Sequence, residues 1–156
     1  MSQPTLLRFA DAVSRVEAAA KGREDFVYER TVPVLDLDTG QPVLDENGEP
    51  ETDSTCVYLE EDQTPSCIVG CAFALDIVEV GITPGSQANE DSVAALFREG
   101  HLLGSRYAVT HRAAVFLQAV QSEQDTQVPW GEAISKAKTK AHAELDDADV
   151  YTGLFR

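Results

Sequence analysis

The stretch that decides the fold lies near the end of the chain, where residues 110–145 read THRAAVFLQAVQSEQDTQVPWGEAISKAKTKAHAEL. In its first half, apolar residues recur at steps of three and four between Ala113 and Val120, which predicts a helix that begins after Thr110. A second helix is predicted to begin at Pro129, which suits a first helical turn. The apolar face of this second helix comprises Trp130, Ala133, Ile134, Ala137, Ala141 and Leu145. The short joint between the two helices predicts that they lie antiparallel.

Three further helices are predicted upstream. Apolar residues at helical spacing run from Leu6 to Ala20, an almost wholly apolar segment runs from Cys67 to Val78, and a shorter helix is expected from Asp91 to Arg98. Within the apolar segment, Gly70 has no side chain beyond hydrogen and would let another backbone or a large ring approach closely. We therefore expect a mainly helical protein.

An acidic insert separates the first two of these helices. Between residues 36 and 62 there are ten carboxylates and neither Lys nor Arg. Turn signals at Asp38-Thr39-Gly40 and Asn47-Gly48 separate short β-prone pieces, and a further strand is expected at Cys56–Leu59. The predicted fold class is α+β: a mainly helical single domain, residues 1–145, with a small antiparallel β-meander or hairpin element at about 31–62. An acidic and aromatic C-terminal tail, residues 146–156, follows it.

Composition restricts the classes of function. The chain has 156 residues, with 12 Lys and Arg against 27 Asp and Glu, giving a formal charge of −15. Direct binding of nucleic acid needs a basic surface and is therefore not expected. No apolar run approaches the roughly 18 residues of a membrane span, and the N-terminus lacks the layout of a signal peptide. Because three cysteines cannot all pair within one chain, we predict a cytoplasmic protein with free thiols.

Four short motifs occur in a set order. They are Cys56-Val57-Tyr58, Pro65-Ser66-Cys67-Ile68-Val69-Gly70, Gln121-Ser122-Glu123-Gln124-Asp125 and Pro129-Trp130-Gly131-Glu132-Ala133. Together they span a little over half of the chain, and the set resembles a group of small proteins from actinobacteria and, above all, from their bacteriophages. That group has no assigned chemistry, so the resemblance implies an origin in a phage or prophage and no active site. The stretch before the first motif is longer here than the resemblance leads us to expect.

One candidate pocket follows from the third and fourth motifs. Gln121, Gln124 and Asp125 stand near the end of one predicted helix, and Trp130 stands at the start of the next. These side chains would either line a polar pocket for a small molecule or simply cap the second helix and orient the indole ring.

Other chemistry finds weaker support in the sequence. Cys67 and Cys71 are one helical turn apart and could share a metal with Cys56, but zinc sites usually add a second close pair of cysteines, which is missing here. Residues 36–40 echo the opening of a calcium loop without its later ligands. Ser66 and Cys67 at a helix start are the one suggestive nucleophile site. We predict no catalytic residue, no metal and no cofactor, and hence no enzyme.

Two features favour binding to another protein. The first is the carboxylate-rich meander, which either keeps the chain soluble or steers it towards a basic patch on a partner. Its candidate contact residues are Asp36, Asp38, Asp45, Glu46 and Glu49. The second is the tail, whose Leu154 and Phe155 are similar to the Leu-Phe end of peptides that dock on the bacterial replicative sliding clamp. Tyr151 stands where such peptides usually carry Gln. The alternative is that Leu154 and Phe155 fold back on the protein's own surface.

The leading hypothesis is a non-enzymatic accessory protein of phage or prophage type. It would bind and modulate a bacterial host protein in the host cytoplasm, with the DNA sliding clamp of replication as the most specific candidate. One alternative is an acidic mimic of DNA that inhibits a DNA-binding host protein. Another, from a different class, is a small-molecule-binding or catalytic domain that uses the pocket near Gln124, Asp125 and Trp130.

Overall fold

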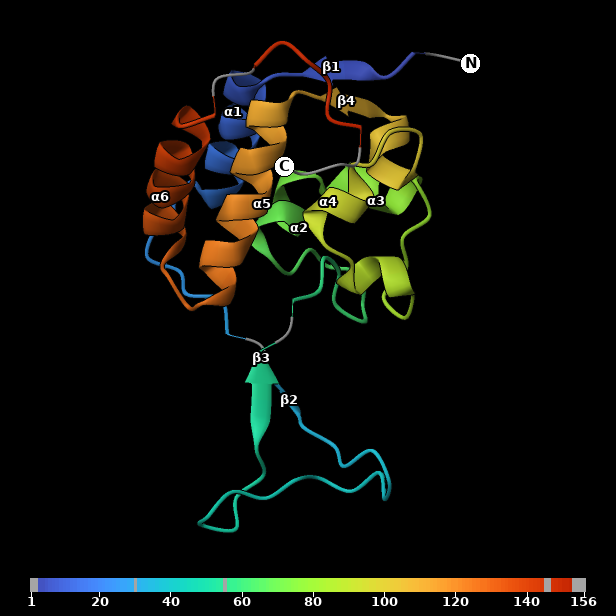
Figure 1. Ribbon diagram of the computed structural model, residues 1–156, viewed down its shortest axis with the longest axis vertical. Helices are drawn as coiled ribbons and strands as arrows, with labels where there is room; N and C mark the ends of the chain where they lie inside the picture. Colours follow the sequence, from blue (N-terminus) through green and yellow to red (C-terminus); the bar gives the residue numbers. More distant parts are fainter. Residues whose placement is uncertain (1–2, 30, 55, 145–146, 153–156) are drawn as a thin grey trace.

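Three long helices form one side of the body of the molecule (Figure 1). The computed structural model describes residues 3–29, 31–54, 56–144 and 147–152. The long helices are α1 (Phe9–Ala20), α5 (His111–Asp125) and α6 (Trp130–His142), and both α1 and α6 pack against α5. The Thr110 hydroxyl accepts a hydrogen bond from the Ala113 N–H at 3.2 Å and so caps α5, while Pro129 immediately precedes α6. The two predicted helices are confirmed, the second as far as His142, whereas Leu145, which we predicted on its apolar face, lies outside the described residues.

Short helices cover the other side of α5. They are α2 (Ile68–Ala72), α3 (Ala74–Glu79) and α4 (Val93–Leu96), with the 3₁₀ turns η1 (Gln87–Glu90) and η2 (Leu102–Ser105). The single helix predicted from Cys67 to Val78 is wrong in one respect, because the chain breaks at Phe73 into α2 and α3. The break directs the fully buried Phe73 ring against the rings of Phe97 and Tyr107, whose centroids lie 5.2 and 5.7 Å away.

The sheet of the body is parallel, so the predicted fold class needs correction. Strand β1 (Thr5–Leu7) pairs with β4 (Tyr107–Val109) in parallel register. The prediction that the β part of the domain is a small antiparallel meander is therefore wrong, although the chain remains mainly helical and α+β in general class. Leu6, which we expected on a helix face, is exposed, and Leu7 is buried, the alternation of a strand. Local spacing missed this strand because its partner lies about a hundred residues further along the chain.

The insert between α1 and α2 leaves the body as a branched arm (Figure 1). We call residues 31–54 the acidic arm. Its stem is the antiparallel pair β2 (Thr31–Pro33) and β3 (Thr52–Ser54). Beyond the stem, three backbone hydrogen bonds form a ring: the Val34 N–H donates to Glu51 at 2.9 Å, Glu51 to Val43 at 2.8 Å, and Val43 to Val34 at 2.8 Å. Each of the three segments that meet here is therefore hydrogen-bonded to the other two. As a result, two separate branches diverge from the stem, and no continuous middle strand forms.

The strand predicted at Cys56–Leu59 is also wrong. Among the described residues this segment has one β-bridge, between Leu59 and Pro65, together with hydrogen bonds from the N–H groups of Ser66 and Cys67 to Tyr58 and Val57. It returns the chain from the arm to the start of α2.

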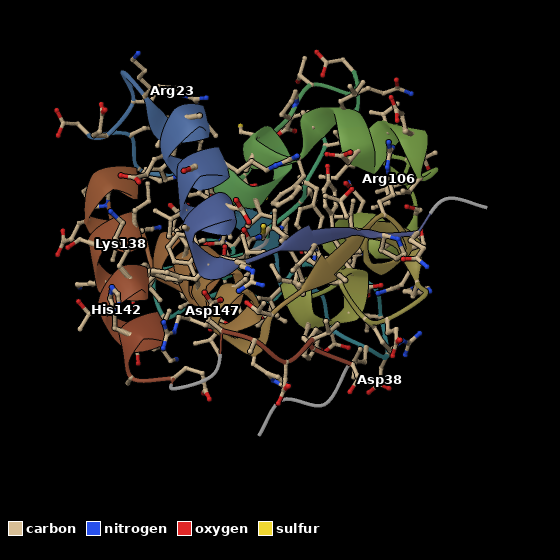
Figure 2. All side chains as sticks on the ribbon, turned by 90° about the horizontal axis from the view of Figure 1, so that it is seen from above. Arg23, Asp38, Arg106, Lys138, His142 and Asp147 are labelled. Atoms are coloured by element: carbon tan, nitrogen blue, oxygen red, sulfur yellow. The ribbon has the colours of Figure 1, made fainter. Side chains whose placement is uncertain are left out.

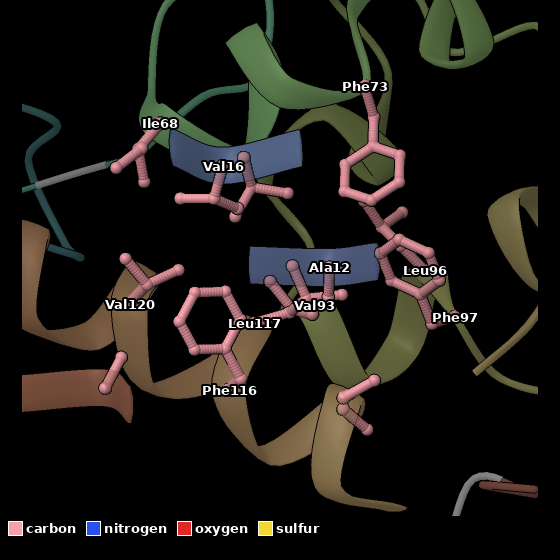
Figure 3. Close-up of a cluster of buried hydrophobic side chains, with 14 of the residues drawn as sticks. Ala12, Val16, Ile68, Phe73, Val93, Leu96, Phe97, Phe116, Leu117 and Val120 are labelled. Atoms are coloured by element: carbon pink, nitrogen blue, oxygen red, sulfur yellow. The ribbon is translucent and has the colours of Figure 1, made fainter. Parts of the chain in front are cut away.

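The core lies where α1, α5 and the short helices meet (Figure 3). A partly buried ionic contact crosses its edge, since the Arg15 guanidinium of α1 lies 2.8 Å from the Asp76 carboxylate of α3 and 2.8 Å from the Tyr107 hydroxyl. No helix in the described part of the chain combines the length and the apolar character that crossing a bilayer requires.

The segment after α6 runs back over the body. Asp147, labelled in Figure 2, accepts hydrogen bonds from the Phe9 N–H at 3.0 Å and from the Thr110 hydroxyl at 2.7 Å. Val150 forms a β-bridge with Thr110, and the Tyr151 N–H donates to the Val109 carbonyl at 2.7 Å. These contacts attach residues 147–152 to β4 and to Thr110, the residue that follows it.

Candidate functional site

The first branch of the acidic arm turns around a carboxylate. Asp36 Oδ1 accepts hydrogen bonds from the N–H groups of Asp38 at 2.8 Å and Thr39 at 3.1 Å. These two backbone donors hold the pKa of Asp36 below its ordinary value, because they stabilise the charged form. Gly40, at a φ of +69°, completes the turn where the sequence signals one. Asp36 therefore organises its own turn.

The second branch repeats this arrangement. Asp45 Oδ1 accepts hydrogen bonds from the N–H groups of Asn47 at 2.8 Å and Glu49 at 3.0 Å. Gly48 follows Asn47 at a φ of +78°. Two of the five carboxylates predicted to face a partner thus have a structural task at the two branch turns.

The remaining three predicted carboxylates are those of Asp38, Glu46 and Glu49. All three residues are exposed. Within the described residues, their carboxylates take part in no hydrogen bond or ion pair. These three charges remain available for contact with another molecule.

The arm also displays large apolar side chains, which the sequence interpretation did not single out. Leu35, Leu37 and Leu44 are 52, 102 and 57% exposed. Leu35 forms an antiparallel bridge with Pro42, and Leu44 forms one with Pro50. Residues directly opposite each other in such bridges place their side chains on the same face, so each branch carries a leucine beside a proline. The signal in the sequence was clearest for Leu37, which stands between Asp36 and Asp38.

The surroundings of the arm in the sequence contain no positive charge. From Thr31 to Phe97 there is no Lys, Arg or His, whereas Asp and Glu occur throughout this stretch. The negative potential of the branches therefore cannot be neutralised by cations of the same segment, and it acts on approaching molecules over about 8 Å at physiological ionic strength.

Three of the four predicted pocket residues lie together. The Ile68 N–H donates to Gln124 Oε1 at 2.7 Å, and Gln124 Nε2 donates to Asp125 Oδ1 at 3.0 Å. Gln121 Nε2 lies within hydrogen-bonding reach of the Cys56 and Cys67 sulfurs. Burial raises the pKa of Asp125 above its ordinary value, although hydrogen bonds from Gln124 and Cys56 oppose this. Gln124 is completely buried, so it caps the start of α2 from within the core.

Trp130 belongs to a different cluster. Its ring packs edge-on against Phe26, with the centroids 4.7 Å apart, and the Arg23 guanidinium lies 4.5 Å from its centre. The indole is fully buried, and its Nε1 has no hydrogen-bond partner among the described residues. The fourth predicted pocket residue thus anchors the start of α6 to the chain after α1.

The predicted tail anchors divide into two groups. Tyr151 is 1% exposed, and its hydroxyl donates a hydrogen bond to the Ala94 carbonyl at 3.0 Å, so it contributes to the core and offers no side chain to a partner. Leu154 and Phe155 lie outside the described residues. The structure therefore gives no geometry for the predicted sliding-clamp contact.

No group of three or more His, Cys, Asp or Glu side chains within the described ranges could hold a metal ion. Comparison of the chain with protein-family models, with curated proteins and with solved structures finds no match. The geometry of the acidic arm is consequently the main guide to function.

Proposed function

We propose that this chain is a non-enzymatic binding protein of phage or prophage type, whose acidic arm engages a bacterial host protein in the cytoplasm. The observation that carries the proposal is the exposure of three leucines, Leu35, Leu37 and Leu44, among carboxylates on a segment that leaves the body. Leu37 is completely exposed and gives no stabilisation to the folded chain, whereas its full burial against a partner is worth about 1.5–3 kcal/mol. Leu35 and Leu44, which are 52 and 57% exposed, would gain less.

The chemistry of the arm specifies its partner. A protein that matches it needs shallow apolar pockets for the leucines and Lys or Arg side chains around them. The charges of Asp38, Glu46 and Glu49 would accelerate the encounter and select against acidic surfaces, and the leucines would slow dissociation. This division of labour between rim charges and apolar anchors is common at protein interfaces.

Affinity purification from a bacterial host lysate identifies the partner, and variants then test the site. One variant carries Leu35→Thr, Leu37→Ser and Leu44→Thr, and its control is Leu75→Ser, which removes a leucine that is 71% exposed on α3. We expect the triple variant to bind the purified partner at least tenfold more weakly and the control to bind normally. Equal affinity of the triple variant and the unchanged protein would refute a role for the arm.

A second triple variant tests the charges. Asp38→Asn, Glu46→Gln and Glu49→Gln remove three charges from the arm, and Asp25→Asn, Glu90→Gln and Glu99→Gln remove three from exposed positions of the body. We expect the association rate to fall and its salt dependence to flatten only when the arm is changed. Identical salt dependence for both triple variants would show that the charges of the arm do not steer binding.

One further candidate shares this surface. The absence of positive charge from Thr31 to Phe97 also suits a mimic of DNA that occupies a DNA-binding groove of a host protein. Duplex DNA should then compete with the chain for the purified partner, and the charge variant should lose more affinity than the leucine variant. The opposite order of losses, without competition by DNA, identifies an ordinary protein-docking surface.

A further inference from the structure

Two of the three cysteines meet at the base of the acidic arm. The Cys67 N–H donates to the Val57 carbonyl at 3.3 Å, so the segment that leaves the arm lies beside the start of α2. Cys56 immediately precedes this contact, and Cys67 is the N-cap residue of α2. Each of these two cysteines affects the pKa of the other, and both sulfurs lie within reach of the same Gln121 amide nitrogen.

The same glutamine side chain reaches both sulfurs. Gln121 Nε2 lies 3.4 Å from Cys67 Sγ and also contacts Cys56 Sγ, while its Oε1 is buried without a hydrogen-bond partner among the described residues. Gln124 Nε2 lies 3.8 Å from Cys56 Sγ. Two amide groups from α5 thus hold the two sulfurs together inside the domain.

The two thiols differ in access and in ionisation. Cys67 is completely buried, and although burial raises its pKa, hydrogen bonds from Cys56, Gln121 and the Gly70 N–H lower it below the ordinary value. Cys56 is half-buried, and its pKa is raised because its proton is held by Cys67 and because it is desolvated. Cys56 is therefore the thiol that solutes can reach, and Cys67 is the one better able to form a thiolate.

The third cysteine has different surroundings. Cys71 is half-buried and lies 3.9 Å from an Arg23 guanidinium nitrogen. Burial raises its pKa, and the positive charge of Arg23 partly opposes this. Within the described residues Gln121 contacts Cys56 and Cys67 but not Cys71, which makes Cys71 an internal control.

We propose that Cys56 and Cys67 form a dithiol site that a low-molecular-weight disulfide oxidises to an intramolecular disulfide. In the first step, the Cys67 thiolate takes the proton of Cys56, and the Cys56 thiolate so formed attacks one sulfur of the small disulfide. A mixed disulfide forms as the sulfur–sulfur bond of the small disulfide breaks, and the leaving small thiolate takes up the proton from Cys67. In the second step, the Cys67 thiolate attacks Cys56 Sγ and displaces the second small thiol, which is also protonated. Two protein thiols are oxidised, and one small disulfide is reduced to two thiols.

The site can be tested with glutathione. The folded protein is equilibrated in buffers that range from fully reduced to fully oxidised glutathione, and the remaining thiols are then alkylated and counted by intact-mass spectrometry. We expect the number of labelled thiols to fall from three to one and the unlabelled protein to lose two hydrogen atoms. Peptide mapping should show Cys56 linked to Cys67 and Cys71 still labelled.

Three variants separate this reaction from others. Cys71→Ser should form the same disulfide, Cys56→Ser should form none, and Cys67→Ser should stop at one glutathione attached to Cys56. Three labelled thiols in the native protein under fully oxidising conditions would overturn the proposal. A disulfide that includes Cys71, or a stable glutathione adduct in the unchanged protein, would also overturn it. All of these outcomes are measured on the unchanged protein, so they hold even if Cys67→Ser does not fold.

Discussion

Phe116 in the body and Leu37 in the acidic arm are both large apolar residues, yet Phe116 is completely buried and Leu37 is completely exposed. The same contrast extends to the aspartates. Asp76 of the body forms an ion pair with Arg15 across two elements, whereas Asp36 and Asp45 of the arm, as far as the described residues go, accept hydrogen bonds from their own turns alone. The body is held together by contacts between residues distant in sequence, and the branches of the arm are held by local ones.

This difference shows that the sequence of the body supports the stability of the fold, whereas that of the arm supports an exposed surface. Fixing the backbone of a residue costs about 1–2 kcal/mol, and a region recovers that free energy mainly through burial. The branches bury little, because their leucines face solvent and only Val34 and Val43 are half-buried. Their sequence is therefore better explained by what the exposed surface contacts than by the stability of the fold.

The largest expected effect sharpens this contrast directly. Phe116→Ala removes a fully buried ring from α5, and we expect it to lower the free energy of unfolding by about 3–5 kcal/mol. Leu37→Ala should change it by less than about 0.5 kcal/mol, because nothing buries that side chain. Urea denaturation followed by circular dichroism measures both values, and comparable losses would mean that the arm is part of the core.

A second change affects close packing in the body. A Cβ added at Gly70 would lie 2.3 Å from the Tyr58 carbonyl oxygen, so α2 or the segment that returns from the arm must move. We expect Gly70→Ala to cost about 1–3 kcal/mol. The matched control is Gly85→Ala, where the added carbon meets nothing within 4 Å. Equal melting temperatures of the two variants would contradict this close approach.

These packing relations mark what the sequence could predict. Helical spacing located α5 and α6, and the absence of a side chain at Gly70 predicted the close approach of another backbone or a large ring, which proves to be the backbone of Tyr58. The parallel pairing of β1 with β4 was missed, because strands of three residues joined across most of the chain leave no periodic pattern.

The candidate site was predictable only in part. Turn signals placed both branch turns, because Asp and Gly stand where those turns require them. The ring of hydrogen bonds that makes the arm branch could not be predicted, because it depends on backbone groups of Val34, Val43 and Glu51 and on no side chain. The burial of Tyr151 was missed because a chain end carries no sign of what it packs against.

A third prediction compares two aspartates that accept two hydrogen bonds each. Asp147 of the body joins the Phe9 N–H and the Thr110 hydroxyl, which belong to distant elements. We expect Asp147→Ala to lower the free energy of unfolding by about 1–3 kcal/mol, and Asp147→Asn, which keeps an acceptor oxygen, to lower it less.

In the arm, Asp45→Ala removes two local hydrogen bonds, from Asn47 and Glu49. Faster hydrogen exchange at those two amides, with an unchanged global transition, is the expected result. A cooperative loss of the whole fold after Asp45→Ala would show that the arm and the body unfold as one unit.

The smallest expected effect is on pH dependence, and its sign differs between the two regions. The pKa of Asp125 in the body is raised by burial, so between the unfolded and the folded pKa the folded protein retains a proton that the unfolded chain has released. Stability linked to Asp125 therefore falls as pH rises through that window. The pKa of Asp36 in the arm is lowered by backbone hydrogen bonds, so its stabilisation is present above the unfolded pKa and is lost as pH falls through the folded one.

Carbon-13 titration of the carboxyl groups should place the titration midpoint of Asp125 above that of Asp36. Asp125→Asn should remove only the loss of stability with rising pH. A midpoint of Asp125 below that of Asp36 would mean that the Asp125 carboxyl group is as well solvated as the carboxyl groups of the arm. The two regions would then not differ in how burial affects their carboxyl groups.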